Sequence, residues 1–340
     1  MALRIAVVGL GHGTDYLPLA KGNARTQLVA VVDTDAARRE AAAAKYGAPA
    51  FASLRDLLAA HVADAVALAL PTPLHAETSI ACLAAGLHVL QEKPLCRTDA
   101  EADAIAAAVA RSGKVFQVGY EVRSSPLHQA MLRHVAAGDL GRLTNIWYNQ
   151  HTYHKPGADR WRDDRANMGG KLFDCAVHYL DLMQQWAGAP LVRVAALGHV
   201  VGQTGPCANE LPDVAIIALE YANGVRGCYN FGQVNRFNDD ASFGLAGTTG
   251  RVMGNPWLPS GAGSYELRTD GGVRVSHVVF DGKLTSPGHL GWREQFDHFV
   301  ATVLDGAQNF CPIADAVGIH RQMRAIDRAL ATGTVVTLAG

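Results

Sequence analysis

The feature that most constrains this chain is the alternation, over residues 1–120, of short apolar runs with alanine-rich stretches. Near-continuous apolar runs are typical of strands covered on both faces, as in a parallel sheet. The predicted strands are Leu3–Val8, Leu28–Val32, Ala65–Leu70, Leu87–Leu90 and Val115–Gly119. The stretches with helix-forming composition are Ala36–Tyr46, Leu74–Ala85 and Asp99–Arg111. This rhythm predicts an α/β fold that begins with a doubly wound parallel sheet.

The rhythm changes after residue 120. Two helices are predicted over Pro126–Ala137 and Gly170–Trp186, and strand-like runs separated by turn residues fill Leu191–Phe280. Two further helices are expected near Trp292–Leu304 and Ala314–Ala331. The pattern predicts an antiparallel or mixed sheet backed by the two preceding helices.

Length and charge narrow the class of protein. A chain of 340 residues suits two domains, predicted at 1–122 and 123–340, with room for the last helices to pack back on the first domain. Lys plus Arg number 30 against 31 Asp plus Glu, so no net field attracts nucleic acid or a membrane surface. The six cysteines contain no C-x-x-C pair, which fits a reduced, cytoplasmic protein. We expect neither nucleic-acid nor membrane partners.

A glycine-rich loop follows the first predicted strand. Gly9 permits a tight turn, and Gly11 allows a pyrophosphate to approach the backbone at a helix N-terminus. Asp33 ends the second strand, 24 positions after Gly9, where a carboxylate accepts hydrogen bonds from an adenosine ribose. The loop and the acid together predict dinucleotide binding.

Other interpretations of this segment stay open. The glycines fit an ordinary turn before a helix, and Asp33 or Asp35 fits a helix cap. Asp33 favours NAD because its charge repels a 2′-phosphate, although Arg38 and Arg39 leave NADP possible.

Three residues farther along suit proton and hydride chemistry. Lys93 follows a central strand, where parallel sheets bind ligands, and Pro94 suggests a cis bond. Asp174 and His178 lie four apart and so share a helix face. His178 could accept a hydroxyl proton, Lys93 could stabilise the alkoxide, and Asp174 could orient the imidazole. A surface ion pair and a solvated lysine are the plain alternatives.

These motifs together resemble the Gfo/Idh/MocA oxidoreductases over nearly the whole chain. The resemblance rests on Gly9 and Gly11, Pro71–His75, Glu92–Pro94, and Gly169–Gly170 leading to Asp174 and His178. It implies a Rossmann domain followed by an α/β domain with a large, mostly antiparallel sheet, and a catalytic set of Lys93, Asp174 and His178. The expected cofactor-binding residues are Gly9, Gly11, His12, Gly13, Thr14, Asp33, Pro71, Thr72, His75, Glu92 and Lys93.

The substrate is expected to be rich in hydroxyl groups, because donors and an aromatic ring precede the catalytic helix. The candidate substrate residues are Arg123, Tyr153, His154, Arg160 and Trp161. His151 and His154 lack a carboxylate or cysteine at useful spacing, so no metal site is expected.

The sequence therefore predicts an NAD-dependent dehydrogenase that oxidises a secondary hydroxyl of a cyclic polyol or sugar to a ketone or lactone. The alternatives are a glycoside-cleaving enzyme that uses NAD transiently and a non-catalytic NAD-linked sensor. The resemblance also implies a homodimer or homotetramer formed through the second domain's sheet.

Overall fold

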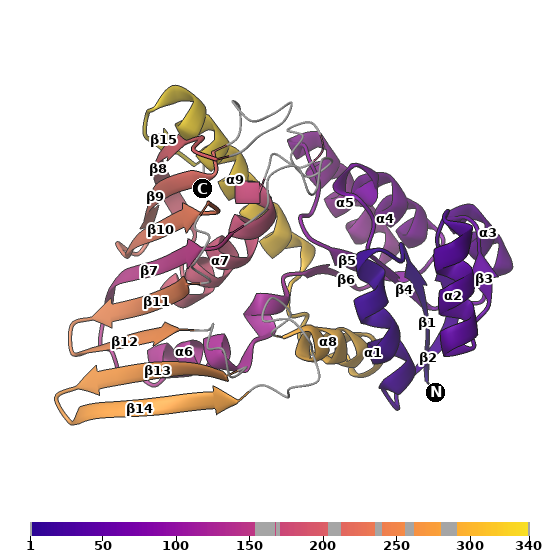
Figure 1. Cartoon of the computed structure of the whole chain (residues 1–340), viewed down its shortest axis with the longest axis horizontal. Helices are drawn as coiled ribbons and strands as arrows, with labels where there is room; N and C mark the ends of the chain where they lie inside the picture. The colour runs from indigo at the N-terminus through magenta and orange to yellow at the C-terminus, as the bar shows by residue number, and fades with distance from the viewer. Residues whose placement is uncertain are drawn as a thin grey trace. The chain divides into compact units, whose positions relative to one another are not determined.

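The chain divides into two compact units, which we describe separately (Figure 1). The first comprises residues 1–120 and 293–320, and the second comprises residues 121–292 and 321–340. The computed structural model describes residues 2–153, 167, 171–202, 212–234, 240–255, 262–279 and 291–338.

The first unit is built on a six-stranded parallel sheet with strand order β3-β2-β1-β4-β5-β6. The strands are β1 (Leu3–Val8), β2 (Thr26–Val32), β3 (Ala50–Phe51), β4 (Ala65–Leu68), β5 (His88–Glu92) and β6 (Phe116–Gly119). The central strands β1, β4 and β5 are almost wholly buried. Apolar residues predominate in β1 and β4, as expected for strands covered on both faces. The chain order reverses between β1 and β4, so the carboxyl ends of these two strands form a topological switch point.

Helices cover both faces of this sheet (Figure 1). They are α1 (Tyr16–Gly22), α2 (Ala36–Tyr46), α3 (Leu54–Ala60), α4 (His75–Ala84), α5 (Asp99–Ser112) and α8 (Trp292–Asp305), with α9 (Ile313–Thr332) beginning in this unit. Local capping sets several starts: Thr98 and Glu101 form a capping box on α5. Asn23 and Arg25 bind Asp297 and Asp305, which attaches α8 to the segment before β2.

The second unit contains a nine-stranded sheet with order β14-β13-β12-β11-β7-β10-β9-β8-β15. The strands are β7 (Leu143–His151), β8 (Leu191–His199), β9 (Val214–Tyr221), β10 (Arg226–Gly232), β11 (Asp240–Gly247), β12 (Gly250–Asn255), β13 (Ala262–Thr269), β14 (Gly272–Val279) and β15 (Val336–Thr337). Neighbours are antiparallel except for β10 and β7, which run parallel. The expected mostly antiparallel sheet is confirmed.

One face of this sheet is covered by α6 (Pro126–Ala136) and α7 (Lys171–Ala187) (Figure 1). Tyr148, Trp186 and Phe243 are almost fully buried there, and His128 of α6 lies among them with ring centroids 5.5–6.2 Å away. Alternation along the strands sends the other side chains to the opposite face. The two helices therefore supply the core of the second unit.

Sequence periodicity identifies the long elements and misses the short ones. Helices α6, α7, α8 and α9 lie within about two residues of their predicted bounds. The two-residue strand β3 has too few residues to show a period. In the described residues, no helix is both long enough and apolar enough to cross a membrane.

Candidate active site

The loop after β1 has the geometry expected of a nucleotide-binding turn. Gly9 has φ +86°, and a Cβ there would lie 2.5 Å from the carbonyl oxygen of Ala69, so only glycine fits without strain. Gly13 is buried against Val7 and Ala69, which brings the short 3₁₀ helix at His12–Asp15 close to the sheet. A Cβ at Gly11 would meet only the Arg38 guanidinium, at 3.9 Å. Open space therefore lies over the loop, where a pyrophosphate would bind.

Asp33 is held rigidly beside this loop. Its carboxylate accepts hydrogen bonds from the backbone N–H groups of Leu10 (2.7 Å) and Asp35 (2.8 Å), and its side chain is 8 % exposed. Asp35, not Asp33, caps α2 by accepting a bond from the N–H of Arg38. Asp33 is thus free of the capping role and is fixed at the carboxyl end of β2. Arg38 approaches its carboxylate to 3.8 Å.

Lys93 leaves the carboxyl end of β5 at the same edge of the sheet. The Lys93–Pro94 peptide bond is cis, as Pro94 suggested. The preceding Glu92 is buried, and its carboxylate accepts hydrogen bonds from the Tyr16 hydroxyl (2.7 Å) and from the Lys93 N–H (3.2 Å). Glu92 therefore fixes the backbone that presents Lys93, while the lysine side chain is half-buried.

His75 lies inside the protein, not on the surface of the nucleotide site. Its ring nitrogens face the carbonyl oxygens of Pro94 (2.7 Å) and Leu70 (2.8 Å), and its side chain has no exposed area. Burial lowers its pKa below the ordinary value. It thus joins the loop after β4 to the loop after β5, which is a structural role that the motif did not predict. Thr72 is also buried, whereas Pro71 is exposed.

The predicted acid–base pair lies on α7 in the second unit. Asp174 and His178 are 6 % and 7 % exposed, so the pair is buried and does not belong to a solvated helix surface. Nδ1 of His178 lies 3.5 Å from Oε2 of Glu121, the first residue of the 3₁₀ helix η3 (Glu121–Ser124). Sequence reasoning missed Glu121, because nothing in the spacing of residues 121 and 178 indicates that they meet.

Arg123 binds a carboxylate inside the protein. Its Nε donates to Oδ2 of Asp181 at 2.8 Å, and Nη2 donates to Oδ1. The two side chains are 4 % and 0 % exposed. This forked ion pair ties η3 to α7, so the structure gives Arg123 a structural role where the sequence suggested contact with substrate.

Of the remaining predicted substrate residues, only Tyr153 lies within the described part of the chain. Tyr153 is 41 % exposed and pairs in an isolated β-bridge with Val234. His154, Arg160 and Trp161, and the glycines at 169 and 170, lie outside the described residues.

Two further predicted cofactor residues lie on the glycine loop. His12 and Thr14 are exposed there, and the Thr14 hydroxyl donates to the Gly11 carbonyl at 3.0 Å.

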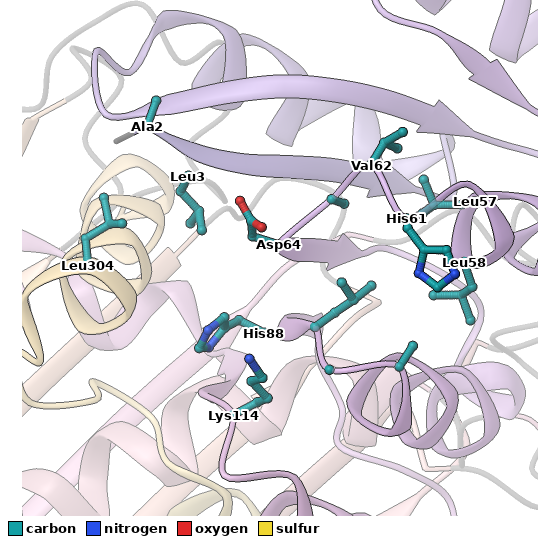
Figure 2. Close-up of a pocket in the computed structure, with 14 residues that line it drawn as sticks. Ala2, Leu3, Leu57, Leu58, His61, Val62, Asp64, His88, Lys114 and Leu304 are labelled. Atoms are coloured by element: carbon teal, nitrogen blue, oxygen red, sulfur yellow. The ribbon is translucent and has the colours of Figure 1, made fainter.

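A cavity of about 360 Å³ lies at the opposite edge of the parallel sheet (Figure 2). Leu3, Asp64, His88 and Lys114 line it, and each stands at or just before the amino end of a strand. Ligands of open parallel sheets bind beyond the carboxyl ends of the strands, so we do not assign this cavity to the reaction.

Across the described ranges, no group of three or more His, Cys, Asp or Glu residues is arranged to hold a metal ion.

Comparison with protein families agrees with this geometry. Residues 3–120 match the model described as the oxidoreductase family with an NAD-binding Rossmann fold, and residues 128–253 match the GFO/IDH/MocA C-terminal domain. These matches cover more than half of the chain. The chain belongs to the GFO/IDH/MocA oxidoreductase family, and its first unit is an NAD-binding Rossmann domain.

Curated relatives include an oxidoreductase subunit of a UDP-kanosamine synthase and an inositol dehydrogenase. The chain is 36% identical over 210 residues to a putative UDP-kanosamine synthase oxidoreductase subunit of Amycolatopsis mediterranei, covering 60% of this chain and 56% of that protein. It is 33% identical over 230 residues to inositol 2-dehydrogenase 1 of Saccharopolyspora erythraea, covering 66% of each. The match thus spans little more than half of the first relative.

The fold also occurs in solved structures. The WlbA dehydrogenase from Bordetella pertussis, crystallised with NADH and UDP-GlcNAcA, superposes with a TM-score of 0.83 at 23% identity. The match covers 100% of both chains. At this identity the likeness establishes the shared fold.

Proposed function

We propose that this protein is an NAD-dependent dehydrogenase that oxidises a secondary hydroxyl of a cyclic polyol or sugar to a ketone or lactone. The observation that supports this most is the position of Lys93. It leaves the carboxyl end of β5, at the sheet edge that also carries the glycine loop and Asp33. A lysine so placed suits a reacting oxygen.

The residues of the first unit fit NAD. The close-packed Gly9, the open space over Gly11 and the fixed carboxylate of Asp33 would hold the pyrophosphate and the adenosine ribose. NAD, when bound, supplies the acceptor for the hydride that leaves the carbinol carbon. The negative charge of Asp33 disfavours the 2′-phosphate of NADP.

Three side chains would act on the hydroxyl group of the substrate. The ammonium of Lys93 would donate a hydrogen bond to the substrate oxygen and stabilise the charge that develops on it. Nε2 of His178 would take the hydroxyl proton, since Nδ1 is turned towards Glu121. Asp174, one turn earlier on α7, would assist His178.

The test measures NADH formation by the purified protein at 340 nm. The substrates are inositol isomers, free aldoses, simple glycosides and UDP-sugars, each with NAD and with NADP. We expect turnover of at least one of them with NAD, and a loss of about 100-fold or more in kcat for Lys93→Met and for His178→Gln. Lys114→Met, at the opposite sheet edge, is the matched control and should retain full activity.

Two other outcomes of this assay would each indicate a different function. Glycoside cleavage without release of NADH would indicate transient oxidation by a tightly held cofactor. NAD binding without any turnover, with wild-type binding in Lys93→Met, would favour a sensor. Either result would overturn the simple dehydrogenase.

We also propose that copies of the chain associate through the face of the nine-stranded sheet opposite α6 and α7. Leu197 and Ile216 are register partners on that face and are 75 % and 56 % exposed. Met253, Val273 and Val275 lie on the same face and are 42–58 % exposed. Apolar side chains gathered on one sheet face are typical of a surface that a partner covers, and a second copy of the chain suits a self-complementary, twofold arrangement.

A further inference from the structure

The catalytic candidate His178 has the carboxylate of Glu121 within ion-pair range of its ring. Oε2 of Glu121 lies 3.5 Å from Nδ1 of His178, an ion-pair distance at which the two atoms do not form a hydrogen bond. Both side chains are buried, with 5 % and 7 % of their surface exposed. Charges are poorly screened by water in such a place, so the contact matters more than it would at the surface.

Glu121 is held in this position by the structure of η3. The Arg123–Asp181 ion pair ties η3 to α7 three residues beyond His178. The Arg123 carbonyl accepts a hydrogen bond from the Gln129 amide at 2.8 Å. On the other side, a Cβ at Gly291 would lie 2.1 Å from the Glu121 carbonyl oxygen, so the backbone of η3 is packed closely there. The carboxylate is therefore placed before any substrate arrives.

We infer that Glu121 is a positioning residue for the proton-transfer step, a role that rests on the proposed function. The negative charge of its carboxylate, 3.5 Å from Nδ1, favours a proton on Nδ1 of His178 and leaves the Nε2 lone pair to accept the substrate proton. When Nε2 takes that proton, the imidazole becomes a cation, and Glu121 balances the new charge. The hydroxyl O–H bond breaks as the Nε2–H bond forms.

Other titratable groups packed near α7 do not supply this charge. Burial lowers the pKa of His128 on α6 to about 3, so it stays neutral. Burial also raises the pKa of the phenols of Tyr179 on α7 and Tyr229 on β10, which keeps both uncharged. Asp181 is engaged by Arg123. Glu121 is therefore the carboxylate that we assign to the charge on His178.

The test follows protonation of His178 by NMR in protein labelled with ¹⁵N-histidine, with the signal assigned through His178→Gln. In Glu121→Gln the midpoint of the His178 titration should fall by about one pH unit or more, because an anion within ion-pair range favours the imidazolium. Glu121→Asp keeps the charge farther away and should give an intermediate midpoint. Asp213→Asn is the matched control, since Asp213 is equally buried in this unit but binds the N–H groups of Val201 and Gly202.

Kinetics give the second readout. In Glu121→Gln the acid limb of the kcat/KM profile should move to lower pH together with the NMR midpoint, and kcat should fall about tenfold or more. Asp213→Asn should reduce stability and leave the acid limb of the kcat/KM profile at the same pH. An unchanged His178 midpoint in both Glu121 variants would overturn the inference. A shifted midpoint in a protein that oxidises nothing would leave the contact standing and overturn the proposed function instead.

Discussion

At the scale of single residues, the same type of side chain has different roles according to what surrounds it. Lys93 remains half-buried at the sheet edge, whereas Arg123 is bound to Asp181 inside the second unit. The sequence predicted both as ligand-binding cations. Motif spacing along one strand and its loop predicts the position of Lys93 at the sheet edge, but the partner of Arg123 lies 58 positions away and could not be anticipated.

We expect Asp33 to decide the choice between NAD and NADP. Replacing it with serine removes the charge that repels a 2′-phosphate, while Arg38, 3.8 Å from that carboxylate, stays nearby. We expect Asp33→Ser to raise the kcat/KM ratio of NADP over NAD by about tenfold or more, which corresponds to a free-energy difference of about 1.4 kcal/mol or more. Steady-state assays with both cofactors measure this ratio. An unchanged ratio would mean that Asp33 does not face the ribose.

His128 makes the stability of the fold depend on pH. Its pKa is about 3 in the folded protein, because burial disfavours the charged ring, against an ordinary value of 6.5. Between these values the unfolded chain binds a proton that the folded chain does not, so stability decreases as the pH falls. The contribution is about 1.4 kcal/mol per pH unit below 6.5.

His128→Phe should remove that part of the pH dependence. The ring would stay among Tyr148, Trp186 and Phe243, and urea unfolding at pH 6.5 and pH 5 would measure the difference. If the unfolding free energy changed equally between the two pH values in the variant and the wild type, the buried histidine would not be responsible for the pH dependence.

At the scale of elements, the Arg123–Asp181 pair fixes η3 against α7. Removing one partner leaves the other charge buried and unpaired, which costs about 3–5 kcal/mol. We therefore expect Asp181→Asn to lower the free energy of unfolding by about that amount. The double variant Arg123→Met with Asp181→Leu should recover much of the loss, because no buried charge remains. A cost below about 1 kcal/mol for Asp181→Asn would contradict a tightly formed pair.

Sequence alone indicates the elements better than the contacts between them. The parallel sheet, the long helices and the cis bond before Pro94 follow from periodicity, caps and a local motif. The burial of His75 between two loops and the approach of Glu121 to His178 depend on tertiary packing, which has no period in the sequence. Local signals therefore located the catalytic candidates but did not reveal what holds them.

At the scale of the whole molecule, the sheet face opposite α6 and α7 predicts the oligomeric state. Ile216→Asp would place a charge on this face, next to its register partner Leu197. We expect light scattering to show a dimer or larger assembly for the wild type and a smaller species for the variant. Leu304→Asp on α8 of the first unit is the control, since Leu304 is an exposed apolar residue that does not belong to that sheet. A monomeric wild type would contradict the proposal.

We propose above that this chain moves a hydride from a carbinol carbon to NAD, with Lys93 and His178 acting on the hydroxyl group. The most direct measurement is a single turnover with inositols, aldoses and UDP-sugars deuterated at their carbinol carbons, followed by mass analysis of the NADH. We predict that one substrate transfers deuterium to the nicotinamide and that Lys93→Met and His178→Gln abolish the transfer. NADH without the label, or a transfer that both variants retain, would contradict the claim.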